Sequence, residues 1–428
     1  MRRRILQIMA IIMCVVIVSG CGDSTGGNTG KNDNSNRDET QSAYDLEDMS
    51  AVVESTGYET VPDAQESTAV QDETDSKNPK YMTTMQVTKD MGIGINLGNT
   101  FEACGSWITG NTVTAYETAW GSPVITKDII AGYAREGFKT LRIPVAWSNM
   151  MGADYTISPA LIARVKEVVG WAIECDMYVI LNIHWDGGWW ADFPVNKANC
   201  MAKYKAVWNQ LTKEFGGYDH RLIFESLNEE GCWDSVWNRY ANTTAGKAEA
   251  YGLLNEINQV FVDLVRSSGN NNSDRHLLIA GYATDVILTC DEAFVMPKDS
   301  ANRCAVSVHY YTPANYCVLT ENSSWAQVKT TWGNDEDKAE LVNNMNLLKV
   351  RFIDKGIPVI MGEFGVVMDN KSKENATLFL TAVAKEAISR DICPVLWDIT
   401  CDYSFYNRKT CAMSEYATLK ENLNNLIK

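Results

Sequence analysis

Short apolar runs alternate with longer segments of mixed polarity from residue 81 to residue 428. Each run has the length of a buried strand, and eight of them follow one another along the chain. They span residues 93–97, 139–145, 178–184, 222–228, 277–282, 304–310, 358–363 and 394–398. The segments between them are long enough to hold a helix, which is the usual connection between parallel strands. The pattern predicts an α/β fold, a closed (β/α)8 or TIM barrel, over residues 81–428.

Three of the intervening segments place apolar residues at helical spacing. They are 157–176, 254–265 and 339–353. The predicted domain is longer than a bare barrel of about 250 residues. The extra residues fall in long segments after strands, at 100–123, 185–200, 231–247 and 311–336. Loops in these positions line the catalytic face of a barrel, so we expect them to shape a groove.

Polar and aromatic side chains gather where the predicted strands end. They are Asn96, Asn99, Arg142, His184, Asn228, Glu229, His309, Tyr311, Glu363 and Trp397. One polar residue at a strand end is ordinary, but packing does not explain one at nearly every strand end. A barrel brings all of these ends to one mouth, where active sites are built.

Two glutamates stand out among these residues. Glu229 ends the stretch LIFESLNEE, and Glu363 ends the apolar run of PVIMGEFG. Two carboxyl groups facing each other at a barrel mouth are the minimum equipment for glycoside hydrolysis. Glu102, Glu225 and Glu230 compete with Glu229 for the acid/base role. Glu225 lies inside its strand and Glu230 points elsewhere by alternation, so Glu229 is favoured.

Other polar residues have structural explanations. His220 and His276 flank predicted strands and are expected to be structural. Asp186 and Asp398 are candidates either for substrate binding or for a hydrogen-bonded loop.

The N-terminus resembles a bacterial lipoprotein signal. Three arginines precede an apolar stretch at 5–18 that is short for a membrane span, and Val18-Ser19-Gly20-Cys21 resembles a lipobox. The resemblance implies a signal peptide at 1–21 and a lipid on Cys21; the alternative is an uncleaved anchor helix. We expect export, with the protein lipid-anchored at the bacterial cell surface or secreted.

Residues 22–80 have few aromatic residues and hold 14 acidic residues against 4 basic ones. Such a segment buries too little apolar surface to fold, and its charges repel one another, so it is expected to be a disordered acidic linker.

The composition limits the kinds of molecule that the chain is expected to bind. The net charge of −16 argues against nucleic acid, which is bound by clustered Lys and Arg. Thirteen Trp and eighteen Tyr suit a polysaccharide, although large barrels also bury aromatic residues. The twelve cysteines form no metal-binding spacing, so no metal or cofactor is expected, and their disulfide pairing stays open. We expect a monomer.

Eight motifs resemble glycoside hydrolase family 5, of the bacterial endoglucanase type similar to subfamily 4. They are GINLGNTFEA (94–103), TAWGSP (118–123), LRIPVAW (141–147), ILNIHWDGGW (180–189), FESLNEE (224–230), VHYYTP (308–313), MGEFG (361–365) and VLWD (395–398). They follow the order of the family and cover the predicted domain, but not the signal or the linker.

The resemblance implies a retaining endo-β-1,4-glucanase acting on plant cell-wall glucans, with Glu229 as acid/base and Glu363 as nucleophile. It places the substrate contacts at Arg142, His184, Asn228, His309, Tyr311, Trp397, Asn99 and Trp185. Arg142 and Tyr311 would favour the ionised form of Glu363, whose charge would raise the pKa of Glu229. Trp185 departs from the pattern, because many relatives carry a second His there.

Several alternatives stay open. Within the same reaction class the protein would be a xyloglucanase, a mixed-linkage glucanase or a β-mannanase, because subsite contacts decide among these glycans. Outside it, the candidates are a non-catalytic surface glycan-binding lipoprotein and a metal-dependent barrel hydrolase.

Overall fold

The computed structural model describes residues 78–231, 233–240 and 243–428. Eight parallel strands pair in chain order, and β1 pairs with β8 to close the barrel. The predicted barrel is confirmed, with every predicted strand present within a few residues of its expected position. The strands are β1 (Gly94–Asn96), β2 (Thr140–Ile143), β3 (Tyr178–Asn182), β4 (Leu222–Glu225), β5 (Leu277–Ala280), β6 (Cys304–Tyr310), β7 (Val359–Phe364) and β8 (Ile392–Leu396).

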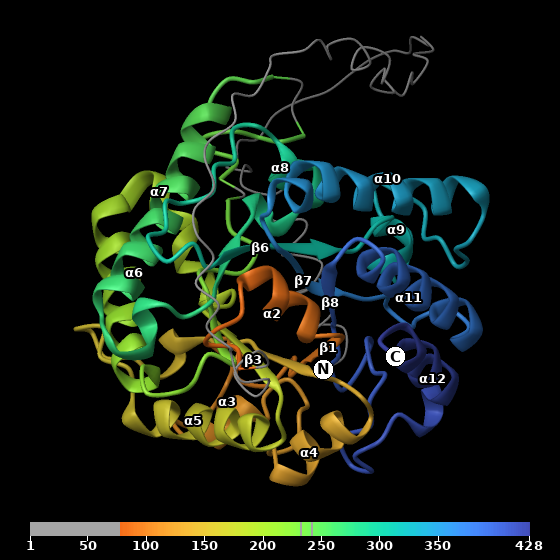
Figure 1. The fold of residues 1–428 in the computed structure, drawn as a ribbon, viewed down its shortest axis with the longest axis horizontal. Coiled ribbons are helices and arrows are strands. Elements are labelled where there is room, and N and C mark those ends of the chain that lie inside the picture. The colour runs from red at the N-terminus through yellow and green to blue at the C-terminus, as the bar shows by residue number, and fades with distance from the viewer. Residues whose placement is uncertain (1–77, 232, 241–242) are drawn as a thin grey trace, which may run out of the picture.

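Helices surround the strands in a ring (Figure 1). They are α3 (Val113–Glu117), α4 (Lys127–Arg135), α5 (Pro159–Glu174), α6 (Phe193–Phe215), α7 (Lys247–Ser267), α8 (Val286–Cys290), α9 (Ala314–Cys317), α10 (Asp335–Arg351), α11 (Lys373–Ile388) and α12 (Ala417–Leu426). The helices expected at 157–176, 254–265 and 339–353 correspond to α5, α7 and α10. The expected loop at 185–200 is shorter, because α6 already begins at Phe193, whose buried ring packs inward beside a Pro in the first turn.

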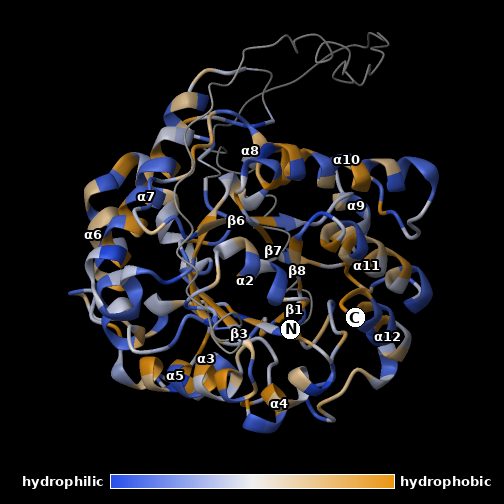
Figure 2. Cartoon of the chain, viewed as in Figure 1, coloured by the Kyte–Doolittle hydropathy of each residue, from blue (hydrophilic) through white to orange (hydrophobic). Residues whose placement is uncertain are grey.

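The apolar core has two parts, as a barrel requires. One cluster fills the space between the strands and the surrounding helices, and a second fills the barrel interior. The second includes Ile180, Ile223, Leu278 and Ile360, which point inward from four different strands. Apolar residues accordingly dominate the central strands, while the outer helices are polar on their exposed faces (Figure 2).

A short helix, α2 (Thr84–Asp90), covers the end of the barrel where the strands begin (Figure 1). Its Val87 joins the interior cluster, and Thr84 Oγ1 lies 2.9 Å from His276 Nδ1. The carbonyl oxygen of Pro79 lies 2.9 Å from the other ring nitrogen of His276. The chain therefore enters the barrel at the end opposite to the carboxyl ends of the strands.

The predicted signal, Cys21 and nearly all of the predicted linker at 22–80 lie outside the described residues. None of the helices within the described ranges combines the length and the apolar character needed to cross a bilayer. Cys104, Cys200, Cys317 and Cys393 are buried free thiols.

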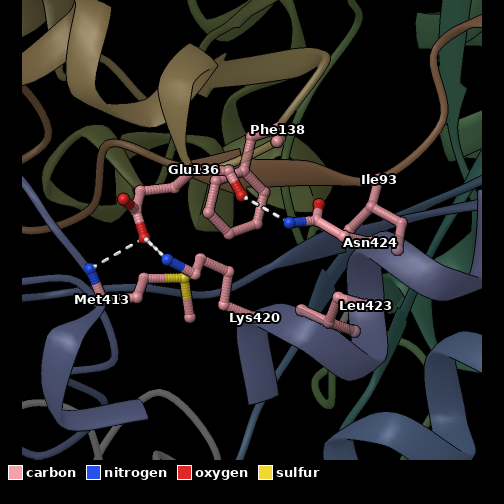
Figure 3. A pocket seen from close by; sticks show the side chains of 8 residues that line it. Ile93, Glu136, Phe138, Met413, Lys420, Leu423 and Asn424 are labelled. Carbon is pink, nitrogen blue, oxygen red and sulfur yellow. Dashed lines mark hydrogen bonds and ion pairs between the residues drawn. The ribbon is translucent and has the colours of Figure 1, made fainter. Parts of the chain in front are cut away.

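The last helix, α12, closes the ring beside β1 and α4. Glu136 accepts hydrogen bonds from Lys420 Nζ (3.3 Å) and Met413 N (3.1 Å), and its carbonyl oxygen accepts one from Asn424 Nδ2 (3.1 Å; Figure 3). The cavity among these side chains measures about 10 Å³. It has room for no more than about one water molecule, so it is a packing defect and not a ligand site.

Candidate active site

The inward-facing residues change from apolar to polar toward the carboxyl ends of the strands. Alternation places every second side chain inside the barrel. The apolar Ile180, Ile223 and Ala305 are thus followed, two residues on, by Asn182, Glu225 and Ser307. The change creates a buried polar layer directly below the barrel mouth.

Arg142 holds this layer together. Its guanidinium donates from Nε to Glu225 (2.8 Å), from Nη1 to Glu363 (2.7 Å) and Asn96 Oδ1 (3.1 Å), and from Nη2 to Asn228 Oδ1 (2.8 Å). The Arg142 side chain is completely buried, so these contacts replace all of its hydration. A planar fork of fixed donors can bind four residues at the ends of the three strands β1, β4 and β7, which a lysine cannot do.

Glu225 supports Arg142 from below. Its Oε1 accepts from Ser307 Oγ (2.7 Å), and its Oε2 accepts from Asn182 Nδ2 (3.1 Å) as well as from Arg142. Both of its carboxyl oxygens are therefore engaged inside the barrel. This excludes Glu225 as the acid/base and makes it the counter-ion that fixes the Arg142 fork.

An irregularity in the sheet aims the next two side chains at the mouth. The pairing of β6 with β7 shifts between Val308 and His309, so that His309 pairs with Glu363 and Gly362 is passed over. A Cβ atom at Gly362 would lie 3.2 Å from Ser307 Oγ and 3.3 Å from His309 Nε2. Any larger residue at position 362 would push these two side chains aside by a few tenths of an ångström.

Glu229 and Glu363 face each other across the mouth, with His309 beside both. His309 Nδ1 lies 2.7 Å from Glu229 Oε1 and 3.6 Å from Glu363 Oε2. One carboxyl oxygen of Glu229, one of Glu363 and a ring nitrogen of His309 all lie within 4.8 Å of one another. The two carboxyl groups are therefore about as close as in retaining glycosidases, where they are ~5 Å apart. Tyr311 also donates its hydroxyl to Glu363 Oε2 at 2.8 Å.

The same three residues are the group that the described part of the chain offers for a metal ion. Arg142, however, already places a full positive charge on Glu363 at 2.7 Å. A divalent cation at this point would meet that guanidinium at close range, which disfavours its binding.

The surroundings of Glu229 and Glu363 act differently on the pKa values of the two carboxyl groups. Burial raises the pKa of Glu229 to about 7, with Arg142 and Arg239 opposing it. Burial also raises the pKa of Glu363, but Glu363 alone has the Arg142 cation and the Tyr311 hydroxyl bound directly to its oxygens. We therefore expect Glu363 to ionise first. Burial, rather than the charge of Glu363 that the family resemblance implied, is the main cause of the raised pKa of Glu229.

The two histidines are neutral, because burial lowers the pKa of His309 to about 4 and that of His184 well below its usual value. Neutral rings can exchange hydrogen bonds with sugar hydroxyls without carrying charge into the site. His184 lies parallel to Trp397, with ring centroids 5.9 Å apart and an interplanar angle of 5°.

The remaining predicted substrate residues lie on loops at the mouth. Asn99 follows β1 with a left-handed backbone (φ 56°), and its Nδ2 lies 3.9 Å from Cys401 Sγ. Trp185 follows β3, is partly exposed and accepts a hydrogen bond from Trp190 Nε1 on its carbonyl oxygen (2.9 Å). Asn99 thus bridges the β1 and β8 loops.

Two carboxylates that competed for functional roles are engaged within loops. Glu102 accepts the backbone N–H groups of Asn99 and Thr100, so it caps the β1 loop and does not face Glu363. Asp186 accepts three hydrogen bonds, from Ser148 N and Oγ and from Trp189 Nε1, each at 2.7 Å. Of the two interpretations of Asp186, the structural one is favoured.

Asp398 accepts the backbone N–H groups of Phe405 and Tyr406, which fixes the loop after β8. His220 and His276 lie where strands begin, at the opposite end of the barrel, and bind Asp274 and Thr84. Their expected structural roles are confirmed.

Three residues of the site escaped sequence reasoning: Asn182, Ser307 and Gly362. Asn182 and Ser307 lie inside strands, where a polar residue reads as an interruption of an apolar run. The signal was their spacing, because each is two residues before a predicted site histidine and therefore on the same face.

The profile of the family described as cellulase (glycosyl hydrolase family 5) matches residues 101–402. Endoglucanase A of Paenibacillus barcinonensis is 35% identical over 350 residues, covering 74% of this chain and 83% of its own. A xyloglucan-specific endo-β-1,4-glucanase of Bacteroides ovatus is 32% identical, covering 78% and 69%. The chain belongs to glycoside hydrolase family 5.

Solved structures agree with this assignment. A subfamily 4 broad-specificity endoglucanase from an uncultured bovine rumen ciliate superposes with a TM-score of 0.73 at 35% identity, covering 81% of this chain and 98% of its own. A family 5 lichenase from a Caldicellulosiruptor species, in complex with cellotetraose, gives a TM-score of 0.74 at 33% identity, covering 81% and 96%. The range matched by the family profile, residues 101–402, includes every strand-end residue described above except Asn96 and Asn99.

Proposed function

We propose that this protein is a retaining endo-β-1,4-glucanase that hydrolyses internal bonds of plant cell-wall glucans by double displacement. The observation that carries the proposal is the close approach of Glu229 and Glu363, which each place a carboxyl oxygen within 4.8 Å of the other. That separation leaves no room for a water molecule between sugar and nucleophile, so it favours a covalent intermediate over inversion.

In the first step, a carboxylate oxygen of Glu363 attacks the anomeric carbon. The bond from that carbon to the leaving sugar oxygen breaks, and the oxygen takes the proton of Glu229. The pKa of about 7 keeps this proton on Glu229 in weakly acidic solution. In the second step, Glu229 accepts a proton from water, the water oxygen bonds to the anomeric carbon, and Glu363 leaves as a carboxylate.

The surrounding residues have distinct roles in this proposal. Arg142 binds the Asn228 carbonyl oxygen, so the amide NH₂ of Asn228 is free to face the sugar, where it would bind the 2-hydroxyl. Trp397 offers an apolar face for the sugar at the cleaved bond, and His184 and His309 offer hydrogen bonds to other hydroxyls. Trp185 and Asn99 would contact the glycan from the loops.

We propose the substrate as a class, the β-glucans, and not as one particular glycan. The relatives include a protein named for xyloglucan and one named as a lichenase, so xyloglucan and mixed-linkage glucan compete with cellulose. Mannan is a further candidate. A glycan-binding protein without catalysis is disfavoured, because both glutamates and the groups that tune them are in place.

The direct test is hydrolysis by the purified full chain, compared with Glu363→Ala, on carboxymethylcellulose, mixed-linkage glucan, xyloglucan and mannan. We expect the parent alone to release reducing ends, with an early fall in viscosity that marks internal cleavage. The rank order of rates identifies the substrate. A folded parent that is inactive on all four glycans would favour the binding-protein alternative, and full activity after exhaustive chelation would exclude a metal-dependent hydrolase.

Glu229→Gln tests the acid role separately. This variant should cut polysaccharide at least ~100-fold more slowly, because no proton reaches the leaving oxygen. Formation of the covalent intermediate from an aryl β-cellobioside with a strongly acidic phenol should be nearly unaffected, since that leaving group needs no proton. Equal losses on both substrates would contradict the assignment.

A further inference from the structure

A third carboxyl group, Glu230, lies beside the proposed acid/base and has no part in the reaction as described above. The residue has no exposed surface. Its side chain turns back to its own backbone, because Oε2 binds the Asn228 N–H. A fully buried acid directly after Glu229 has to be accounted for, because burying a carboxyl group without a purpose is costly.

The side chain of Glu230 folds back on its own strand end. Its Oε2 accepts the backbone N–H of Asn228 at 2.5 Å, which closes a small ring around Glu229. Its other oxygen, Oε1, has no hydrogen-bond partner among the residues that the structure describes. The ring fixes the backbone that carries both Asn228 and Glu229.

The backbone of Glu230 ties the same turn to the next loop. Its carbonyl oxygen accepts the N–H of Ala283 at 2.7 Å. Ala283 and Thr284 both have left-handed backbones, with φ values of 52° and 46°. Side chain and main chain of one residue therefore anchor the end of β4 in two directions.

The surroundings of Glu230 do not support a negative charge. Glu229 and Glu225 are the carboxyl groups of the same strand end, and the Tyr204 hydroxyl from α6 donates to Ser226 O at 2.9 Å. All three Arg142 nitrogens are engaged by Glu225, Glu363, Asn96 and Asn228. Burial raises the pKa of Glu230 well above its usual value and outweighs the backbone N–H groups of Asn228 and Glu230, which act to lower it. The neighbouring Glu229 and Glu225 carboxyl groups act in the same direction as burial.

We infer that Glu230 is a positioning residue that works as a neutral carboxylic acid, accepting the Asn228 N–H so that Asn228 and Glu229 hold their orientation toward the sugar. Neutrality is essential to this role. A carboxylate at 230 would repel the charge that Glu229 acquires in the second half of the reaction. The inference rests on the proposed role of Glu229.

The test compares Glu230→Gln with Glu230→Leu in the full chain, using kcat, KM and the pH profile of kcat/KM. Glutamine copies a neutral acid and keeps an acceptor for the Asn228 N–H, so we expect kcat/KM within about 2-fold of the parent and the same alkaline limb. Leucine removes the acceptor at similar volume. We expect kcat to fall ~10- to 100-fold with little change in KM, because small misplacements of reacting groups are costly.

Glu117→Gln is the control for replacing a buried acid far from the site, since Glu117 accepts the Ile125 N–H at 2.7 Å and pairs with Arg164 at 2.8 Å on the outside of the barrel. It should leave the pH profile unchanged. An alkaline limb that moves to lower pH in Glu230→Gln would overturn the inference, because it would reveal a charge at 230 that raises the pKa of Glu229. So would a Glu230→Leu variant with the kcat of the parent.

The Gln comparison stays decisive if Glu230→Leu does not fold. Failure of the proposed function is distinguishable from failure of the inference, because it would appear in the parent and in Glu229→Gln on the aryl substrate.

Discussion

Arg142 Nη1 lies 2.7 Å from Glu363 Oε1, and both side chains are buried, with exposed fractions of 0% and 6%. The ion pair joins β2 to β7 across the barrel. Glu225 holds the opposite edge of the same guanidinium at 2.8 Å, so the cation is shared between a carboxylate proposed to react and one that does not. The sharing fixes the direction of the Glu363 carboxyl group, whose second oxygen accepts the Tyr311 hydroxyl at 2.8 Å.

Arg142→Lys tests this arrangement. A lysine keeps the charge but supplies one donor position where the guanidinium supplies a planar fork to four residues. We expect kcat/KM to fall by roughly 100-fold, in line with the loss of one well-placed electrostatic contact. The measurement is steady-state kinetics on the best glycan, with thermal unfolding to confirm folding. A loss below about 3-fold would mean that charge alone is sufficient.

Tyr311→Phe should move the acid limb of the pH profile. The Tyr311 hydroxyl donates to Glu363 at 2.8 Å and so favours the ionised carboxylate. Without it, the pKa of Glu363 rises, less nucleophile is ionised in acid, and the acid limb of kcat/KM moves to higher pH. A hydrogen bond of about 1 kcal/mol corresponds to ~0.7 pH unit.

Tyr316→Phe is the control for that experiment. The Tyr316 hydroxyl donates to Asn375 Oδ1 at 2.7 Å, in the same region of the chain but not to either glutamate. Its removal should leave the acid limb in place. Movement of the limb in both variants, or to lower pH in Tyr311→Phe, would contradict the assignment.

The fold could be predicted from sequence because each strand is an apolar run with its own boundaries. The mouth residues could also be predicted, since strand ends converge in any barrel. Glu229 and Glu363 are 134 positions apart in the chain, yet Glu363 lies at the end of β7 and Glu229 lies in the loop that follows β4.

The layer below the mouth could not be predicted in the same way. The bond from Ser307 to Glu225 depends on which residues become neighbours when the barrel closes. The shift of register at His309 depends on Gly362, and neither leaves a periodic trace. In the sequence, Glu225 reads as a polar interruption of an apolar strand. In the structure, it is a partner that allows the Arg142 side chain to be buried.

The anchor is a separate prediction from the sequence. We propose that Cys21 is lipidated and that the protein is held at the bacterial cell surface. Cys21→Ser in the full chain should move the protein from the membrane fraction to the soluble fraction of a bacterial host. Cys14→Ser, within the apolar stretch, is the matched control and should stay with membranes. Retention of both variants would favour the uncleaved anchor helix.

Glu102→Gln tests the β1 loop, and two effects oppose each other there. The Glu102 carboxyl group accepts the N–H groups of Asn99 and Thr100, whereas a glutamine offers one acceptor and turns an NH₂ toward the other N–H. The variant should lose about 1–3 kcal/mol of stability, and activity should fall because Asn99 loses its fixed backbone.

The pH dependence of that loss gives the sharper test. Burial raises the pKa of Glu102 from 4.5 to about 7, so between these values the folded protein binds more protons than the unfolded chain. The parent therefore loses stability as the pH rises from 4.5 to 7, by roughly 3 kcal/mol, while glutamine does not titrate. The stability gap between parent and variant should shrink over this range in denaturant unfolding. A gap that widens toward alkaline pH would show that the two N–H groups outweigh burial and hold Glu102 as a carboxylate.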